Sequence, residues 1–133
     1  MARRTRVTSP EVAEPAPGLW SNCIRVGEVV HVSGMTARGA DGATIEGRDA
    51  YEQARIIFAK IKRLVEAAGG AMNDVAKVTI YVTDIGQNTG VWRARREFFA
   101  GDFPASTLVE VSALAKPEML VEIEAVAYVG SSR

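Results

Sequence analysis

Residues 120–129 alternate strictly between two faces of an extended chain. One face is wholly apolar and carries Val121, Ile123, Ala125 and Ala127. The other face is mixed and carries Leu120, Glu122, Glu124, Val126 and Tyr128. Because successive side chains of a strand point to opposite sides, this pattern predicts a β-strand with one buried face. The mixed face is either half-solvated, as in many antiparallel sheets, or covered by another subunit with one glutamate serving a pocket.

Four further strands are indicated by apolar runs rich in β-branched residues. The runs at 23–26 and 29–33 are separated by Gly27-Glu28, which is typical of a tight hairpin. A third run at 75–83 alternates, and a fourth is expected at Leu108–Leu114, after the break at Phe103-Pro104. Together with residues 120–129, these segments predict five strands.

Two helices are predicted between the strands. Asp49 opens the longer one, with Glu52 three residues later as in a capping box, and Gly69-Gly70 ends it. Its apolar stripe at helical spacing comprises Tyr51, Ala54, Phe58, Ile61, Val65 and Ala68. A shorter helix is expected from about Thr89 to Ala100.

The predicted order, ββαβαββ, defines an α+β domain with two helices packed on one face of a mixed sheet. We expect residues 1–133 to form a single domain. Residues 1–18 are expected to be an extended arm, in which a short edge strand at Arg6–Thr8 is one alternative. Two helices cover one sheet face, so the mixed face predicts contact with sister subunits.

Composition excludes several functional classes. Sixteen basic and sixteen acidic residues leave no net charge, which argues against nucleic-acid and membrane partners. Cys23 is the single cysteine, so no internal disulfide is expected, and a reducing cytoplasm fits. With His31 as the single histidine, no metal site is expected, and no dinucleotide-binding fingerprint indicates a cofactor.

Several motifs in order resemble one known family. The sequences VSGM, AGG, DVAKVTIYVTD, FPA, VEV and EIEA are similar in order and spacing to the Rid family (YjgF/RidA, formerly called endoribonuclease L-PSP), from about Trp20 to Tyr128. The resemblance implies the chorismate-mutase-like YjgF fold and a homotrimer with three clefts between subunits. In the best-known branch it also implies hydrolysis of reactive enamines and imines to ketoacids and ammonia.

The resemblance also implies which residues line the cleft. Glu122 matches the glutamate of EIEA and is expected to position the attacking water. The substrate-binding residues are expected to be Trp20, Ser33, Arg38, Trp92, Ser106, Thr107 and Leu108. Each of them could instead be a strand or loop residue that serves packing alone.

One departure separates this chain from the deaminase branch. An arginine that follows FPA there binds the substrate carboxylate, whereas this chain has Ser106, which offers one neutral donor. Arg38 or Arg93 is a possible substitute. Three hypotheses follow: a hydrolytic deaminase of a small enamine or imine other than 2-aminoacrylate, a non-catalytic homotrimer that binds a small metabolite, and a ribonuclease or translation inhibitor.

Overall fold

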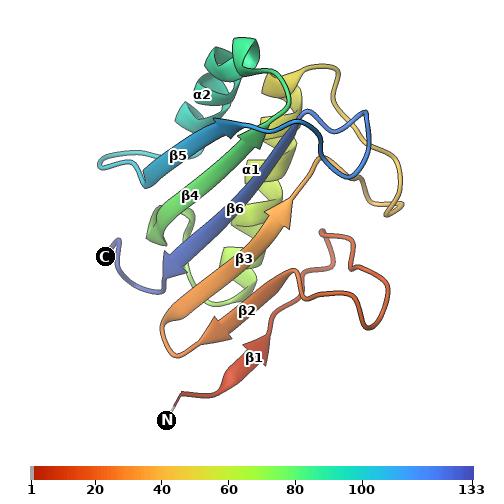
Figure 1. Cartoon of the computed structure of the whole chain (residues 1–133). Coiled ribbons are helices and arrows are strands. Elements are labelled where there is room, and N and C mark those ends of the chain that lie inside the picture. Colours follow the sequence, from red (N-terminus) through yellow and green to blue (C-terminus); the bar gives the residue numbers. More distant parts are fainter. Residues whose placement is uncertain (1) are drawn as a thin grey trace.

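The structure, a computed structural model, describes residues 2–133 as one mixed sheet covered on one face by two helices (Figure 1). The strands are β1 (Arg4–Arg6), β2 (Cys23–Val26), β3 (Val29–Met35), β4 (Val75–Val82), β5 (Ala105–Glu110) and β6 (Val121–Tyr128). Their order across the sheet is β1-β2-β3-β6-β4-β5. Only the β4–β5 pair is parallel among the pairings of this sheet, so the predicted α+β fold with a mixed sheet is confirmed.

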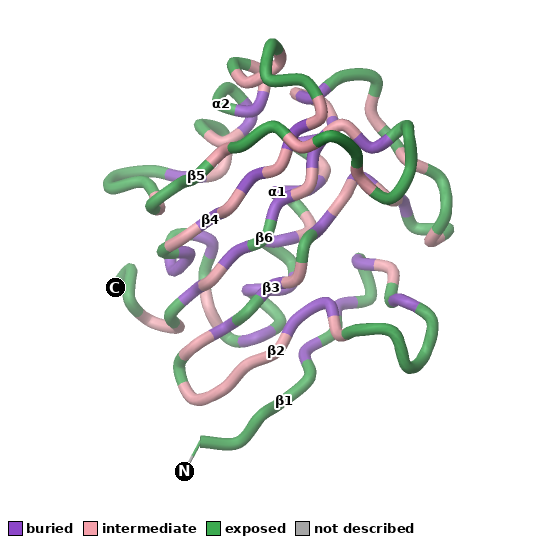
Figure 2. Tube along the Cα trace, viewed as in Figure 1, coloured by how far each residue is buried: buried purple, intermediate pink, exposed green. Residues whose placement is uncertain are grey.

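The alternating pattern of residues 120–129 becomes β6, which lies between β3 and β4 at the centre of the sheet. Val121, Ile123, Ala125 and Ala127 are all buried against the helices, as the periodicity predicts (Figure 2). The opposite face carries Glu122 and Glu124, and neither helix of residues 2–133 covers it (Figure 1). Tyr128 on β6 remains 46% exposed and Val109 on β5 remains 40% exposed on this open face.

Helix α1 (Ala50–Ala67) begins where the sequence predicts. The Asp49 carboxylate accepts a hydrogen bond from the backbone N–H of Glu52 at 2.9 Å, which caps the first turn. The Glu52 carboxylate, however, accepts from the backbone N–H of Arg48 rather than from that of Asp49, so the reciprocal half of the capping box is displaced by one residue. An ion pair with the Arg48 side chain favours this position.

Helix α2 (Asn88–Arg96) is shorter than predicted because its last turn tightens. The N–H groups of Glu97 and Phe98 bond to carbonyls three residues earlier, a geometry typical of a helix end. Phe98 and Phe99 therefore follow the helix, and their rings pack 5.7 and 5.8 Å from the ring of Phe58 on α1. Two short 3₁₀ turns, η1 (Met72–Asp74) and η2 (Ile85–Gln87), flank β4.

The strand expected at Leu108–Leu114 is misplaced, since β5 spans Ala105–Glu110. Its parallel register with β4 runs from the pair Lys77 and Ala105 to the pair Val82 and Glu110, so β5 ends where β4 ends. The edge strand expected at Arg6–Thr8 lies two residues earlier, at β1, where Arg4 to Arg6 pair with β2.

The N-terminal segment after β1 is more than an extended arm. Val7 and Val12 are buried in the core cluster, so this segment packs against the domain. Cys23 is fully buried, and burial raises the pKa of its thiol to about 11, as expected of an inert cysteine.

Two possible features are absent from the described part of the chain. Neither helix within residues 2–133 is long and apolar enough to span a membrane. In the same residues, His, Cys, Asp and Glu side chains do not gather in groups of three that could hold a metal ion.

Candidate functional site

A cavity of about 290 Å³ lies at the end of the sheet where β3 ends and β6 begins. The segments that enclose it follow β3, precede β6 and precede β2, and the first two of them lie together at one end of the sheet in Figure 1. Its lining includes Trp20, Gly34, Arg38, Lys60, Met119 and Glu122. This volume is at the lower end of the range for small-molecule sites.

A β-bulge next to the cavity brings Glu122 against β3. The β3–β6 register shifts between Val32 and Met35, which inserts an extra residue at this point of β3. A Cβ atom added to Gly34 would overlap the carboxyl group of Glu122. Glycine at position 34 is therefore what allows this carboxylate to lie directly on the strand backbone.

The Glu122 carboxylate differs from that of Glu124, two residues later on the same face. Among residues 2–133, no hydrogen bond or ion pair engages the Glu122 side chain, whereas Glu124 accepts a hydrogen bond from the Tyr81 hydroxyl at 2.8 Å. Glu122 is half-buried and Glu124 is exposed. Burial, and to a lesser degree the charge of Glu124, raises the pKa of Glu122 above the ordinary glutamate value.

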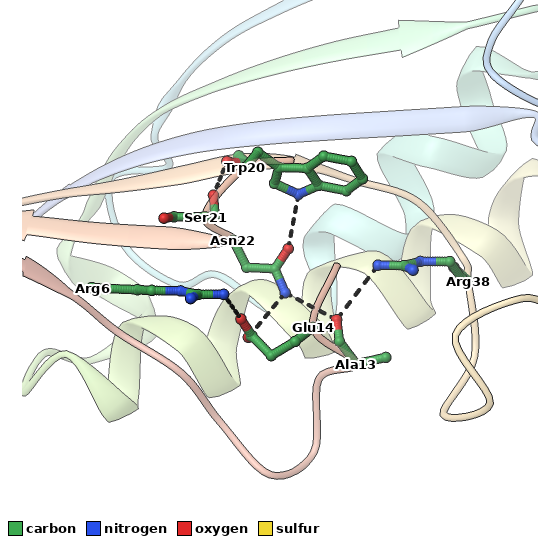
Figure 3. A network of polar contacts seen from close by, with 8 residues as sticks. Arg6, Ala13, Glu14, Trp20, Ser21, Asn22 and Arg38 are labelled. Carbon is green, nitrogen blue, oxygen red and sulfur yellow. Dashed lines mark hydrogen bonds and ion pairs between the residues drawn. The ribbon is translucent and has the colours of Figure 1, made fainter. Parts of the chain in front are cut away.

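Trp20 reaches the cavity from the segment that precedes β2, and a polar network fixes it there (Figure 3). Its indole N–H donates to the side-chain oxygen of Asn22 at 3.2 Å. The buried Asn22 amide in turn donates to the Ala13 carbonyl at 3.0 Å and to Glu14 at 3.3 Å. The predicted cleft residue Trp20 therefore lines the cavity on a well-supported loop.

Arg38 and Ser33 lie close to this cavity but differ in their roles. The Arg38 guanidinium lines it and donates to the Gly42 carbonyl at 3.0 Å. It also donates to the Ala13 carbonyl at 3.5 Å (Figure 3). The Ser33 hydroxyl donates to the Ser21 carbonyl at 2.6 Å, and Ser33 is not among the residues that line the cavity. Its hydroxyl supports the segment before β2, next to Trp20.

The remaining predicted residues lie elsewhere, on and beside β5. Ser106 and Leu108 pair with the buried Val78 and Ile80, so both point to the helix-covered face of the sheet. Thr107 points to the open face, where its hydroxyl accepts from the Lys77 ammonium at 2.7 Å. Trp92 lies on α2 and is 40% exposed. Within one chain, the predicted site residues therefore form two separate groups.

Two residues near these groups were missed by the sequence analysis. Lys60 on α1 lines the cavity, although lysine was assigned no role there. Arg95 on α2 donates to the Ser106 hydroxyl at 2.7 Å and is half-buried. The position that lacks the expected arginine thus has a guanidinium from a different element beside it.

The sequence of this chain is similar to those of known proteins. The sequence profile of the endoribonuclease L-PSP family matches residues 11–129. A 2-iminobutanoate/2-iminopropanoate deaminase of Dermatophagoides farinae is 35% identical over 124 residues, which are 91% of this chain and 94% of that protein.

Solved structures agree in fold. A protein of unknown function from Pseudomonas aeruginosa is 43% identical with a TM-score of 0.88, and the match covers 98% of this chain and 95% of that one. A protein of unknown function of the conserved Rid family from Yersinia pestis is 30% identical with a TM-score of 0.87, over 96% of this chain and 100% of that one. The chain therefore belongs to the endoribonuclease L-PSP family, which is also the Rid (YjgF/RidA) family.

Proposed function

We propose that this chain is a hydrolytic deaminase of a small reactive enamine or imine, acting in clefts between the subunits of a homotrimer. The observation that carries the proposal is the half-buried carboxylate of Glu122, which has no partner among residues 2–133, at the wall of a cavity of small-metabolite size. The relative named as a 2-iminobutanoate/2-iminopropanoate deaminase supports the same reaction class.

The reaction requires few catalytic groups from the protein because a protonated C=N bond is already electrophilic. Glu122 accepts a proton from a water molecule as its oxygen attacks the carbon, and a carbinolamine forms. The proton then passes to the amine nitrogen, the C–N bond breaks, and a carbonyl compound and ammonia leave. An enamine enters the same sequence after protonation at its β-carbon. This hydrolysis needs no oxidant, reductant or metal to be complete.

The division of the predicted residues into two groups supports a site shared between copies. Glu122 and Trp20 face the cavity on one side of the molecule, while Ser106, Leu108 and Trp92 lie near the β5 edge of the sheet. A cyclic contact that places the β5 edge of one chain against the cavity of the next brings both groups together. The exposed side chains of the open face, Val109 and Tyr128 among them, would be buried in such an assembly.

A glutamine substitution of each glutamate tests the role of Glu122. We expect Glu122→Gln to abolish imine hydrolysis and Glu124→Gln to change it little, because Glu124 is already bonded to Tyr81. The assay generates 2-aminoacrylate or its homologue with a dehydratase and follows the ketoacid. Because the carboxylate must be ionised to accept a proton, wild-type activity should fall with decreasing pH at a higher pH than an ordinary glutamate would give.

Thermal unfolding is the control for folding. The raised pKa of Glu122 means that the folded state favours its protonated form, a contribution lost as pH rises through the folded pKa. At pH 7 the neutral glutamine should therefore leave stability unchanged or slightly higher. Equal losses of activity in Glu122→Gln and Glu124→Gln, or a loss of assembly in the former, would contradict the assignment.

A non-catalytic homotrimer that binds a small metabolite is the second candidate. Ser106 in place of the expected arginine favours it, because the substrate anchor of the deaminase branch is missing. A wild-type chain that binds a ketoacid but hydrolyses no imine would support this reading. The ribonuclease reading requires RNA cleavage, and the single histidine, His31, lies exposed on β3 with no acid–base histidine partner in the sequence.

A further inference from the structure

The cavity that contains Glu122 is rich in cationic side chains. Arg38, Lys60 and Lys116 all contribute to its lining, and Glu122 is the one acidic residue among the lining side chains of the described chain. Three cations around one half-buried carboxylate leave an excess of positive charge. A small anionic ligand would offset that excess, whereas a neutral ligand would not.

Two backbone carbonyls hold the Lys60 ammonium in place. Lys60 extends from α1 and donates to the Thr36 carbonyl at 2.8 Å and to the Arg38 carbonyl at 3.1 Å. An ammonium group has three N–H donors, so these two bonds leave one for a ligand. Both carbonyls belong to the segment that follows β3, which fixes the position of the ammonium at the cavity wall.

Neither Lys60 nor Arg38 has an acidic partner within 4 Å among residues 2–133. Burial and, to a lesser degree, the charge of Arg38 lower the pKa of Lys60 to about 8, with the charge of Glu46 acting in the opposite direction. Within residues 2–133, the Arg38 guanidinium donates to two backbone carbonyls, those of Gly42 and Ala13. Two cations that repel one another, with no carboxylate in ion-pair contact among residues 2–133, are the arrangement that an anion would stabilise.

We propose that Lys60 and Arg38 bind the carboxylate of a small ligand in this cavity and so orient its reactive carbon toward Glu122. The identity of the reacting ligand as an imine rests on the proposed function, but the anion site does not. Lys60 is then a specificity-determining residue. It supplies from α1 a charge–charge contact that Ser106, with one neutral hydroxyl, does not supply from β5.

Two matched probes test the charge requirement. The carboxylate 2-oxobutanoate and the neutral ketone butanone are each titrated into the wild-type protein, and the indole N–H signals of its two tryptophans are followed by NMR. Trp20 lines the cavity, so its signal reports occupancy there. The Trp92 signal is not a reference, because the proposed assembly brings Trp92 close to the cavity of the next chain. We expect a saturable shift of the Trp20 signal with 2-oxobutanoate and little or none with butanone.

Substitutions then identify the anchor. Lys60→Met and Arg38→Met should each weaken 2-oxobutanoate binding about tenfold to a hundredfold, the effect of losing a hydrogen bond to a charged group. Lys62→Met, an exposed lysine two residues along the same helix, should change nothing. Lys60→Gln separates charge from folding, because its amide retains N–H donors but carries no charge, so it should lose affinity while keeping a near-normal Tm.

The pH dependence gives an independent readout. Binding requires the charged ammonium, so affinity for 2-oxobutanoate should fall as pH rises through about 8, and binding at pH 8 should take up protons. The charged groups that face or surround Lys60 are Arg38, Glu46, Lys116 and Glu122. Glu122→Gln should preserve this high-pH limb, which assigns it to Lys60 rather than to the carboxylate.

The outcomes separate this inference from the proposed function. Equal shifts with butanone and 2-oxobutanoate, or wild-type affinity in both Lys60 variants, would overturn the anion site even if imine hydrolysis is found. The wild-type protein could instead bind the carboxylate through Lys60 and show no hydrolytic activity. That outcome would support the anion site and contradict the deaminase proposal.

Discussion

Individual carboxylates in this protein occupy very different environments, and their neighbours decide what each can do. Glu122 is half-buried and unpaired within the described chain, and its pKa is raised. Asp74 is buried at 2% exposure, but its carboxylate accepts four hydrogen bonds. The first arrangement suits a group that must exchange protons, and the second suits a group that holds the chain together.

Asp74 should make stability depend on pH. Its oxygens accept from the N–H groups of Ala71, Gly130 and Ser132 and from the Ser132 hydroxyl, which together tie the segment after β6 to η1. Burial alone would raise the pKa of Asp74, but these hydrogen bonds outweigh it and lower the pKa well below the usual aspartate range. Its stabilising effect is therefore complete above the unfolded pKa of about 3.9 and is lost as pH falls below it.

We expect Asp74→Asn to cost on the order of 3 kcal/mol at pH 7, since bonds to a charged acceptor are lost and an amide N–H₂ meets backbone donors. The difference from wild type should shrink as pH falls below about 4. Denaturant unfolding at several pH values measures both effects, with the exposed Asp102→Asn as the control. A constant difference across the acid range would refute the role of the charge.

At the scale of elements, the pattern of each segment predicted its type, and its neighbours set its limits. The alternation of residues 120–129 was enough to predict β6 and the residues of its buried face, because a one-residue slip would expose the whole apolar set. The start of β5 was missed because it depends on parallel pairing with β4, which no local pattern encodes. The end of α2 was missed because Phe98 and Phe99 pack on Phe58 beyond the helix.

The candidate site was predictable in part for the same reason. Glu122 and Trp20 were identified from the resemblance, and both line the cavity. Lys60 could have been suspected, since Gln53, Ile57, Lys60 and Leu64 follow one another at helical spacing, and the other three are buried. A lysine in such a stripe needs a polar destination, but the sequence alone does not place the Thr36 and Arg38 carbonyls beside it.

Gln53 illustrates how an element positions the site. This fully buried side chain on α1 donates to the carbonyls of Gly47 at 3.2 Å and Glu118 at 2.9 Å, and it accepts from the Leu120 N–H at 2.9 Å. It therefore holds the segment before β6 against the helix, next to the cavity residue Met119.

We expect Gln53→Met, which keeps the volume but removes these bonds, to destabilise the fold by about 2–4 kcal/mol, because buried backbone groups lose their partners. The exposed Lys62→Met should stay within about 0.5 kcal/mol of wild type. Thermal and denaturant unfolding give both values. A near-neutral Gln53→Met would mean that the loop is held mainly by its other contacts, such as the Thr83 N–H bond to the Leu120 carbonyl at 3.1 Å.

For the whole molecule, the decisive property is the assembly. We expect a homotrimer of about 43 kDa, three times the chain mass of 14.3 kDa. Its open sheet faces should be buried together and the β5 edge of one subunit should meet the cavity of the next. A stable monomer at micromolar concentration in light scattering would remove the shared cleft.

A shared cleft makes a prediction that a site within one chain does not. Glu122→Gln inactivates the cavity wall, and Leu108→Arg should block the opposite wall with a bulky charge at the β5 edge. Leu108 is half-buried, so Leu108→Arg must first show a trimer and a near-normal Tm. Each variant alone should be nearly inactive.

In a ring of three, every mixed trimer has one cleft in which both walls are intact, so equal co-refolding should restore about a quarter of wild-type activity. Mixing without subunit exchange is the control and should restore none. If co-refolded mixtures that contain mixed trimers by native mass spectrometry stay inactive, the two groups of residues do not form one site.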